Sequence, residues 1–195
     1  MPRYSTWLDT LPQYPFARVG RLSREVEQRD GIKVINARIG IPDREAPSAV
    51  KRLMSQFVSQ EGSTYGYPVD VYPERGIPEL VDAIIRHYRE RHGTEVKPEN
   101  IAVTSWTKEV LHNLARLFDS GSVVIPEPVY PAYEGATLLS GHRAKRVKTS
   151  EESGWIPEFE FDDNDVLFYF CDPNNPTGNM FDEAAIVILI DFSYR

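Results

Sequence analysis

The chain has 195 residues, of which 41% are apolar, and it carries a net charge of −7. This length predicts one domain with a sizeable core, and the acidic balance argues against a nucleic-acid partner. The sequence holds no run of about 18 apolar residues, and its first residues lack the apolar stretch of a signal peptide. A single cysteine, Cys171, excludes an internal disulfide and fits a reducing compartment. We therefore expect a cytoplasmic protein that neither spans nor enters a membrane.

Four segments carry apolar residues at spacings of three and four, and glycines follow them, as is typical of amphipathic helices and their ends. These predicted helices cover residues 15–29, 47–60, 77–92 and a stretch that begins near Thr107.

Short runs of β-branched and aromatic residues lie after the third helix and predict strands. The runs are Ile101–Thr104, Val123–Ile125, Val166–Cys171 and Ile186–Ile190. The last run has no polar alternation, which is typical of a strand buried on both faces. Alternating helices and strands predict a three-layer α/β/α fold with a mainly parallel sheet, in which 101–104 and 166–171 are central strands. Residues 60–76 and 149–164 are expected to be loops.

Chemically distinctive segments follow each expected strand. They comprise a helix start, a proline-rich turn with a tyrosine, an asparagine-rich turn and an aspartate segment, at Ser105–Lys108, Pro126–Pro131, Asp172–Gly178 and Asp191–Tyr194. Ligands of parallel α/β sheets bind outside the carboxyl ends of the strands. A helix N-terminus, an aromatic ring, an amide and a carboxylate that meet there would suit a flat, phosphorylated heteroaromatic ligand.

Six segments, in this order, resemble the class I and II aminotransferases of fold type I, which use pyridoxal phosphate. They are Ile39–Asp43, Tyr65–Pro68, Gly76–Leu80, Pro126–Tyr133, Asn174–Gly178 and Asp191–Tyr194. The resemblance implies that residues 33–195 form part of the cofactor-binding large domain of that fold. Residues 1–32 would then be an N-terminal helical arm.

The resemblance also implies roles around the cofactor ring. Asp191 resembles the aspartate that pairs with the pyridine nitrogen and keeps it protonated, so that the ring can accept electrons. Tyr194 and Asn175 resemble the residues that hydrogen-bond the ring O3′, and Tyr130 resembles the aromatic that stacks on the ring. Taken singly, these residues also suit turns, caps and core packing. A cis peptide bond is expected at Asn175–Pro176, with Glu127–Pro128 as a second candidate.

The predicted phosphate site is the helix that starts at Thr107 and Lys108, because free N–H groups and the helix dipole attract phosphate there. Trp106 stands where the family usually has glycine. The alternative is that Thr107 only caps the helix.

Two further contacts are implied by the resemblance. Tyr67 resembles a tyrosine that reaches the phosphate of the neighbouring subunit in a homodimer, with Tyr65 and Tyr72 as competing candidates. Gly40 resembles a glycine whose backbone meets the substrate carboxylate, and Asn175 would contact the same group. The implied substrates are an amino acid and a 2-oxo acid, and no metal is expected.

The resemblance predicts a Schiff-base lysine after the Asp191–Tyr194 segment, where only Arg195 follows. None of the six lysines matches that position, so we expect no catalytic residue here and interpret the chain as an N-terminal half. Only 14 residues separate Cys171 from Ile186. A parallel crossover usually takes a dozen or more and includes a helix. We therefore expect a chain shortened between 179 and 186, with a natural short connection as the alternative.

The predicted function is pyridoxal-phosphate-dependent transfer of an amino group from an amino acid to a 2-oxo acid, by a protein of which this chain is a part. Carbon–sulfur lyases that use the same cofactor share these motifs and are an alternative. A non-catalytic binding or regulatory module with an aminotransferase-like fold is a second alternative.

Overall fold

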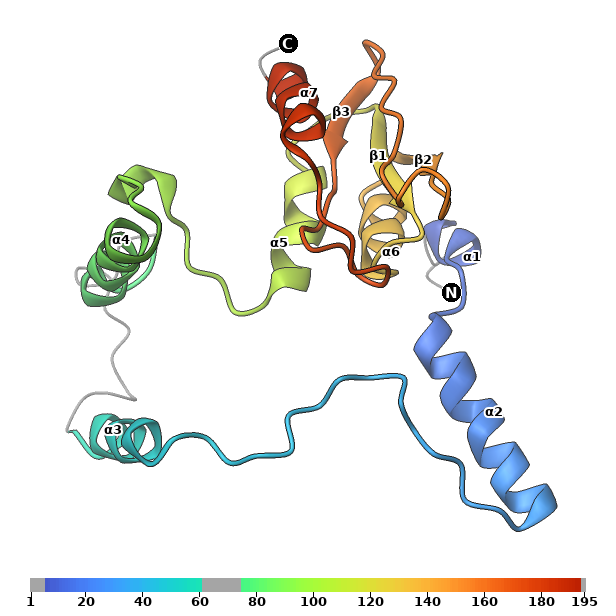
Figure 1. The fold of residues 1–195 in the computed structure, drawn as a ribbon, viewed down its shortest axis with the longest axis horizontal. Helices are drawn as coiled ribbons and strands as arrows, with labels where there is room; N and C mark the ends of the chain where they lie inside the picture. The colour runs from blue at the N-terminus through green and yellow to red at the C-terminus, as the bar shows by residue number, and fades with distance from the viewer. Residues whose placement is uncertain (1–5, 61–74, 194–195) are drawn as a thin grey trace, which may run out of the picture. The chain divides into compact units, whose positions relative to one another are not determined.

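A computed structural model describes residues 6–60 and 75–193 (Figure 1). The chain divides into two compact units. The first unit combines Met1–Ile32 with Trp106–Arg195, and the second is Lys33–Ser105. The first unit contains the elements α1 (Trp7–Thr10), α2 (Pro15–Asp30), α5 (Thr107–Ala115), β1 (Ser122–Glu127), α6 (Ala132–Leu139), β2 (Arg143–Lys148), β3 (Asp165–Phe168) and α7 (Glu183–Ser193). The second contains α3 (Ser48–Val58), α4 (Pro78–His92) and the 3-10 helix η1 (Pro98–Asn100).

A parallel sheet of three strands, in the order β2-β1-β3, forms the centre of the first unit. In the register of the sheet, Ser122 of β1 pairs with Arg143 of β2 on one side and with Asp165 of β3 on the other. The central strand is the most buried, because Val123 and Val124 are fully enclosed. Burying each such side chain contributes roughly 1.5–3 kcal/mol. The sheet therefore gains its stability mainly from β1.

Helices cover both faces of this sheet. Along β3 and the two residues that follow it, side chains alternate between the faces, as the two-residue period of an extended chain requires. Leu167 and Tyr169 join a core made with α5, β1 and α6. Phe168 and Phe170 face the other way, toward an aromatic cluster that reaches Phe192 of α7. The layered α/β fold expected from the sequence is thus confirmed.

Gly121 allows β1 to start close to β3. Its φ of +136° lies in a region that side chains rarely adopt. A Cβ at this position would lie 2.6 Å from Cγ1 of Val166 and 2.7 Å from the backbone oxygen of Asn164. That oxygen accepts the N–H of Ser122 at 2.7 Å. A glycine is therefore required where the two strands begin.

The amphipathic helices form as predicted, with α2, α3, α4 and α5 at the expected places. Gly31 and Gly93 end α2 and α4 in the left-handed conformation, and their N–H groups bond the preceding turn. Each of these two helices has a proline in its first turn, where a missing N–H carries no penalty. No helix in the described part of the chain is long and apolar enough to cross a membrane.

Two of the predicted strands are wrong. Ile101–Thr104 is not a strand, and it belongs to the unit that lacks the sheet. No strand of the described residues pairs with its backbone, and the N–H of Val103 donates to the oxygen of Arg75 at 2.8 Å. Residues 186–190 are helical and form the middle of α7. Asp182 starts this helix, because its side chain accepts the N–H of Ala185 at 2.8 Å.

The other two strand predictions are confirmed with different limits. β1 extends by one residue before and two residues after the predicted Val123–Ile125. β3 ends at Phe168, and it lies at an edge of the described sheet and not at its centre. The sequence analysis did not predict β2 or α6.

Candidate functional site

The segments that follow β1 and β3 meet at the carboxyl edge of the sheet. The side-chain amide of Asn174 donates to the backbone oxygen of Pro128 at 3.2 Å. The hydroxyl of Tyr133 donates to the backbone oxygen of Phe170, also at 3.2 Å. These two hydrogen bonds join the turn after β1 to the turn after β3, as the position of parallel strand ends predicts.

The turn after β3 is held by its own hydrogen bonds and leaves one amide exposed. The buried Asn174 donates to Oγ1 of Thr177 at 2.7 Å, and its backbone N–H bonds the oxygen of Asn179 at 2.8 Å. Gly178, with a φ of +74°, returns its N–H to the oxygen of Asn174 at 2.7 Å. Asn175 lies at the exposed tip. The turn thus presents a predicted site residue to solvent.

Both peptide bonds that were expected to be cis are cis. A third cis bond lies between them in the sequence, and the three are Glu127–Pro128, Asp172–Pro173 and Asn175–Pro176.

Three tyrosines run from the carboxyl edge into the core. The half-buried Tyr130 meets the ring of Tyr133 edge-on, with centroids 5.8 Å apart. Tyr133 stacks on Tyr169 at 4.9 Å, and the hydroxyl of Tyr169 donates to the backbone oxygen of Leu111 in α5. Burial raises the pKa of both inner tyrosines to about 12, and the thiol of Cys171 adds to the effect at Tyr133. Both hydroxyls therefore remain hydrogen-bond donors at neutral pH.

A small cavity of about 180 Å³ opens beside Tyr130. Its other walls include Pro15 from the N-terminal segment and the Glu134–Arg146 ion pair. The predicted ring-stacking residue therefore borders free space on one side and Tyr133 on the other.

The start of α5 combines a helix N-terminus with a hydroxyl and an ammonium group. Trp106 is extended, makes no side-chain cap, and leaves Thr107 as the first helical residue. The alternative that Thr107 caps the helix is therefore wrong. Both Thr107 and Lys108 are exposed, and the first N–H groups of a helix lack intrahelical acceptors. The ammonium of Lys108 lies 5.1 Å from the ring centroid of Tyr14.

α5 begins at the same edge of the sheet as Tyr130 and Asn175. It leads into β1 and so runs opposite to the strands, and its first turn lies at the end of the unit where the segment after β3 turns (Figure 1).

Asp191 lies away from this edge. α7 starts near the turn after β3, where the N–H of Phe181 bonds Asp172 at 3.1 Å. Asp191 is eight residues into the helix, a rise of about 12 Å. It borders a cavity with Phe161, which precedes β3 and stacks on Phe192 at 3.9 Å. The expected carboxylate at the carboxyl edge is thus not brought there, because the strand that would carry it is a helix.

The remaining predicted residues lie in the other compact unit or outside the described residues. Gly40 lies in an exposed segment of the other compact unit. Tyr67 and Tyr194 lie outside the described residues, as do the competing Tyr65 and Tyr72. Sequence reasoning missed Tyr133 and Asn174. Each stands close to a predicted residue in the sequence, but only their long-range hydrogen bonds distinguish them.

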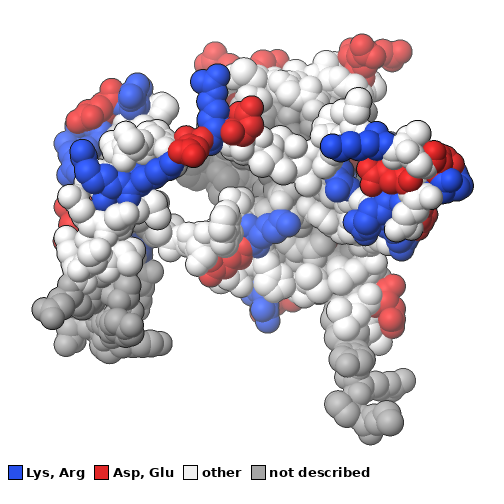
Figure 2. Space-filling model, turned by 90° about the horizontal axis from the view of Figure 1, so that it is seen from below, with Lys and Arg blue, Asp and Glu red and all other residues white. Residues whose placement is uncertain are grey.

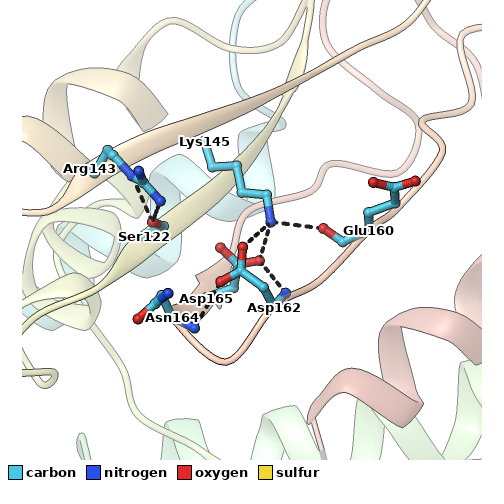
Figure 3. Close-up of polar contacts among 7 residues, drawn as sticks. All are labelled: Ser122, Arg143, Lys145, Glu160, Asp162, Asn164 and Asp165. Carbon is cyan, nitrogen blue, oxygen red and sulfur yellow. Dashed lines mark hydrogen bonds and ion pairs between the residues drawn. The ribbon is translucent and has the colours of Figure 1, made fainter.

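A second polar cluster lies at the opposite, amino edge of the sheet (Figure 3). The ammonium of Lys145 donates to Oδ2 of Asp165 at 2.6 Å, to Oδ2 of Asp162 at 2.9 Å and to the backbone oxygen of Glu160 at 2.9 Å. The hydrogen bond with Asp165 raises the pKa of Lys145, and that with Lys145 lowers the pKa of Asp162. The described residues include no group of three or more side chains suited to a metal. The cluster joins β2 to β3 across β1 and is structural.

Acidic and basic side chains are interspersed over the face shown in Figure 2.

Comparison with known proteins identifies the family. The sequence profile of the family described as aminotransferase class I and II matches residues 32–195. The chain belongs to the class I and II aminotransferases. Members of this family depend on pyridoxal phosphate, so the resemblance inferred from the motifs is confirmed.

Relatives of this aminotransferase chain are about twice as long. An LL-diaminopimelate aminotransferase of Halothermothrix orenii is 29% identical over 194 residues, which are 95% of this chain and 48% of the relative. Transaminase BacF of Bacillus subtilis is 31% identical over 185 residues, 91% of this chain and 45% of the relative. The chain thus spans about half the length of the curated relatives it matches.

Solved structures agree in fold. The alanine aminotransferase from Pyrococcus furiosus superposes with a TM-score of 0.83 at 27% identity, over 98% of this chain and 49% of that one. Substrate-bound BacF superposes with a TM-score of 0.82 at 26% identity, over all of this chain and 50% of that one. The fold is therefore that of the fold-type-I aminotransferases.

The carboxyl edge of this aminotransferase chain fits part of the family's cofactor. Tyr130 offers a ring face beside a cavity, Asn175 offers an exposed amide, and the start of α5 offers donors and a positive charge for a phosphate. Asp191, the carboxylate predicted to pair with the pyridine nitrogen, does not lie at this edge, because it is part of α7.

Proposed function

We propose that the carboxyl edge of the sheet binds pyridoxal phosphate, and that the protein to which this chain belongs transfers an amino group from an amino acid to a 2-oxo acid. The observation that carries this proposal is the pair of hydrogen bonds, from Asn174 and from Tyr133, that joins the turns after β1 and β3. They bring the segments of Tyr130 and Asn175 together at the edge from which α5 also starts.

Each of these residues has a proposed task. Tyr130 flanks the ring face, and Asn175 donates its amide to the ring oxygen and to the substrate carboxylate. The first N–H groups of α5, with Thr107 and Lys108, hold the phosphate, because a helix N-terminus attracts anions. When bound, the cofactor supplies an electron-withdrawing ring that acidifies the Cα proton of an amino acid.

The remaining predictions extend this proposal to the whole protein. We propose a cytoplasmic homodimer of amino-acid biosynthesis whose large domain includes residues 33–195. Tyr67 and Tyr194 keep their proposed cofactor contacts, and Gly40 keeps its contact with the substrate. Asp191 can reach the pyridine nitrogen only if residues 186–191 leave the helix, so its proposed role depends on a rearrangement of α7.

Binding to this chain is proposed to be non-covalent, since none of its six lysines follows Asp191. Pyridoxal phosphate followed by borohydride reduction is expected to label no single lysine stoichiometrically. Stoichiometric labelling of one lysine, such as Lys108, would contradict non-covalent binding.

Titration with pyridoxal phosphate, followed by its absorbance and by protein fluorescence, tests the site. Tyr130→Ala would remove one aromatic contact with the cofactor ring, so we expect the Kd for pyridoxal phosphate to rise about two- to tenfold. Tyr88→Ala, at a partly exposed tyrosine of α4, is the control and is expected to bind as the parent does. Equal affinities of parent, Tyr130→Ala and Tyr88→Ala would rule out the proposed ring site.

A non-catalytic binding module is the second candidate. The placement of Asp191 in α7 favours it, because the residue predicted to keep the pyridine nitrogen protonated then lies away from the carboxyl edge. An amino acid added to the cofactor-loaded chain would change the cofactor spectrum if the chain took part in transamination. An unchanged spectrum with intact cofactor binding would support the binding module.

A further inference from the structure

We infer that Tyr133 is a positioning residue of the cofactor edge, which fixes the ring of Tyr130 and the turn that carries Asn175 relative to each other. This inference rests on the proposed cofactor site. It concerns a residue that contacts the proposed binding groups and not the cofactor itself.

Tyr133 touches both halves of the site with one side chain. It lies in the first turn of α6, is 7% exposed, and its backbone N–H bonds the oxygen of Tyr130 at 3.1 Å. Its ring meets Tyr130 edge-on at an interplanar angle of 85°, which is a favoured arrangement for aromatic pairs. Its hydroxyl donates to the oxygen of Phe170, at the start of the turn after β3.

These contacts restrict two separate motions, which are the rotation of the Tyr130 ring and the movement of the turn after β3. Tyr130 is half-buried, and its contact with Tyr133 restricts the rotation of its ring. The bond to Phe170 fixes where the chain leaves the sheet, five residues before Asn175. Asn174 adds a second tie across the same gap through Pro128. Loss of the Tyr133 hydroxyl would therefore release the turn at one of its two ties.

Tyr169 provides an internal control because it resembles Tyr133 in burial, in the ring contact between the two and in the type of bond that its hydroxyl makes. Both are buried, they stack on each other, each donates its hydroxyl to a backbone oxygen, and burial raises the pKa of each to about 12. The hydroxyl of Tyr169 bonds Leu111 and so joins β3 to α5. It does not join the turn after β1 to the turn after β3.

The test compares Tyr133→Phe with Tyr169→Phe in the full chain. Each substitution keeps the ring and removes one hydrogen bond, so both are expected to fold and to lose similar stability in urea. Tyr133→Phe removes a hydrogen bond that orders the site, so we expect the Kd for pyridoxal phosphate to rise about three- to tenfold. Tyr169→Phe is expected to change Kd less than about twofold.

Two further measurements separate positioning from general stability. At saturating cofactor, the induced circular dichroism band reports how the bound ring is held, and it should change in Tyr133→Phe but not in Tyr169→Phe. Amide exchange of residues 172–178 should become faster in Tyr133→Phe alone.

The outcomes distinguish the inference from the proposed function. A parent chain that binds no pyridoxal phosphate would overturn both. A parent that binds, with both variants equal to each other in Kd and in the induced band, would overturn the positioning role of Tyr133 and leave the cofactor site intact.

Discussion

Replacement of Lys145 by methionine is expected to destabilise the sheet strongly. Lys145 extends from β2 over the central strand to Asp165 of β3, whose side chain is fully buried. The Oδ2 atom of Asp165 then keeps only the N–H of Asp162, at 2.9 Å. Its Oδ1 atom is already buried without a hydrogen-bond partner among the described residues. The variant would therefore leave a buried carboxylate without its counter-charge.

The expected loss follows from the burial of the two partners. Breaking a buried ion pair by removing one partner costs about 3–5 kcal/mol. The side chain of Lys145 is 26% exposed, so water can reach part of the site, and we expect the lower end, about 3 kcal/mol. With a urea m-value of about 2 kcal/mol/M, the unfolding midpoint should fall by about 1.5 M.

Urea unfolding of matched variants measures this effect. Lys148→Met, at an exposed lysine of the same strand, is the control and should change stability by less than about 0.5 kcal/mol. The double variant Lys145→Met with Asp165→Asn removes the stranded charge and should recover most of the loss. A loss for Lys145→Met no greater than that for Lys148→Met would refute the reasoning.

The same cluster has a defined pH dependence. The pKa of Lys145 is raised, mainly by its hydrogen bond with Asp165. The contribution of Lys145 to folding stability is therefore complete below about pH 10.4 and is lost as the pH rises through the pKa of the folded state. The pKa of Asp162 is lowered by Lys145, so its contribution is present above about pH 3.9 and is lost as the pH falls through the folded pKa. The penalty of Lys145→Met should therefore shrink as the pH rises above about 10.4, because the parent then loses the ammonium charge of Lys145.

Three further variants test the fold. Gly121→Ala should lose about 2–4 kcal/mol of stability in urea unfolding, because its Cβ would lie 2.6 Å from Val166. Gly154→Ala, which has open space around it, should lose about 1 kcal/mol. Equal losses would contradict the close approach at Gly121. Burial raises the pKa of Tyr133 to about 12, so its contribution to folding stability is complete below about pH 10 and is lost as the pH rises through 12. Tyr133→Phe should therefore remove one late step from a tyrosinate absorbance titration. An unchanged titration would argue against that burial. Ile188→Thr should raise solubility, because this apolar side chain is 46% exposed on α7; unchanged light scattering would mean that the side chain is covered in solution.

Local sequence signals predicted four of the helices, which are α2, α3, α4 and α5. Glycines at 31 and 93 adopt the left-handed conformation that ends α2 and α4, and prolines at 15 and 78 stand in their first turns. These signals depend on a few neighbouring residues, so no knowledge of distant contacts is needed to use them.

Composition alone misassigned residues 186–190. A short apolar run suits a buried strand or a buried helix equally, and only its flanks can decide. Asp182, followed by Glu183 and two alanines, is a helix start, and its side chain caps the first turn of α7. The strand interpretation gave more weight to the β-branched residues than to this cap, and it placed Asp191 at the wrong edge of the sheet.

Short motifs in the sequence pointed to the exposed residues of the proposed site, and none pointed to the residues that hold these in place. Tyr130 and Asn175 stand in short motifs that the sequence displays directly. Tyr133 and Asn174 act through hydrogen bonds to Phe170 and Pro128, which are 37 and 46 residues away in the chain. Such ties depend on how β1 and β3 come together, and no local pattern encodes them.

Amide hydrogen exchange with and without pyridoxal phosphate tests most directly whether the carboxyl edge binds the cofactor. Bound cofactor should slow exchange at the start of α5, in the turn after β1 and in the turn after β3, which are residues 107–111, 128–133 and 172–178. Exchange in α7, residues 183–193, should stay unchanged, because Asp191 lies away from that edge. Unchanged exchange in all three segments, or protection centred on α7, would contradict the proposed site.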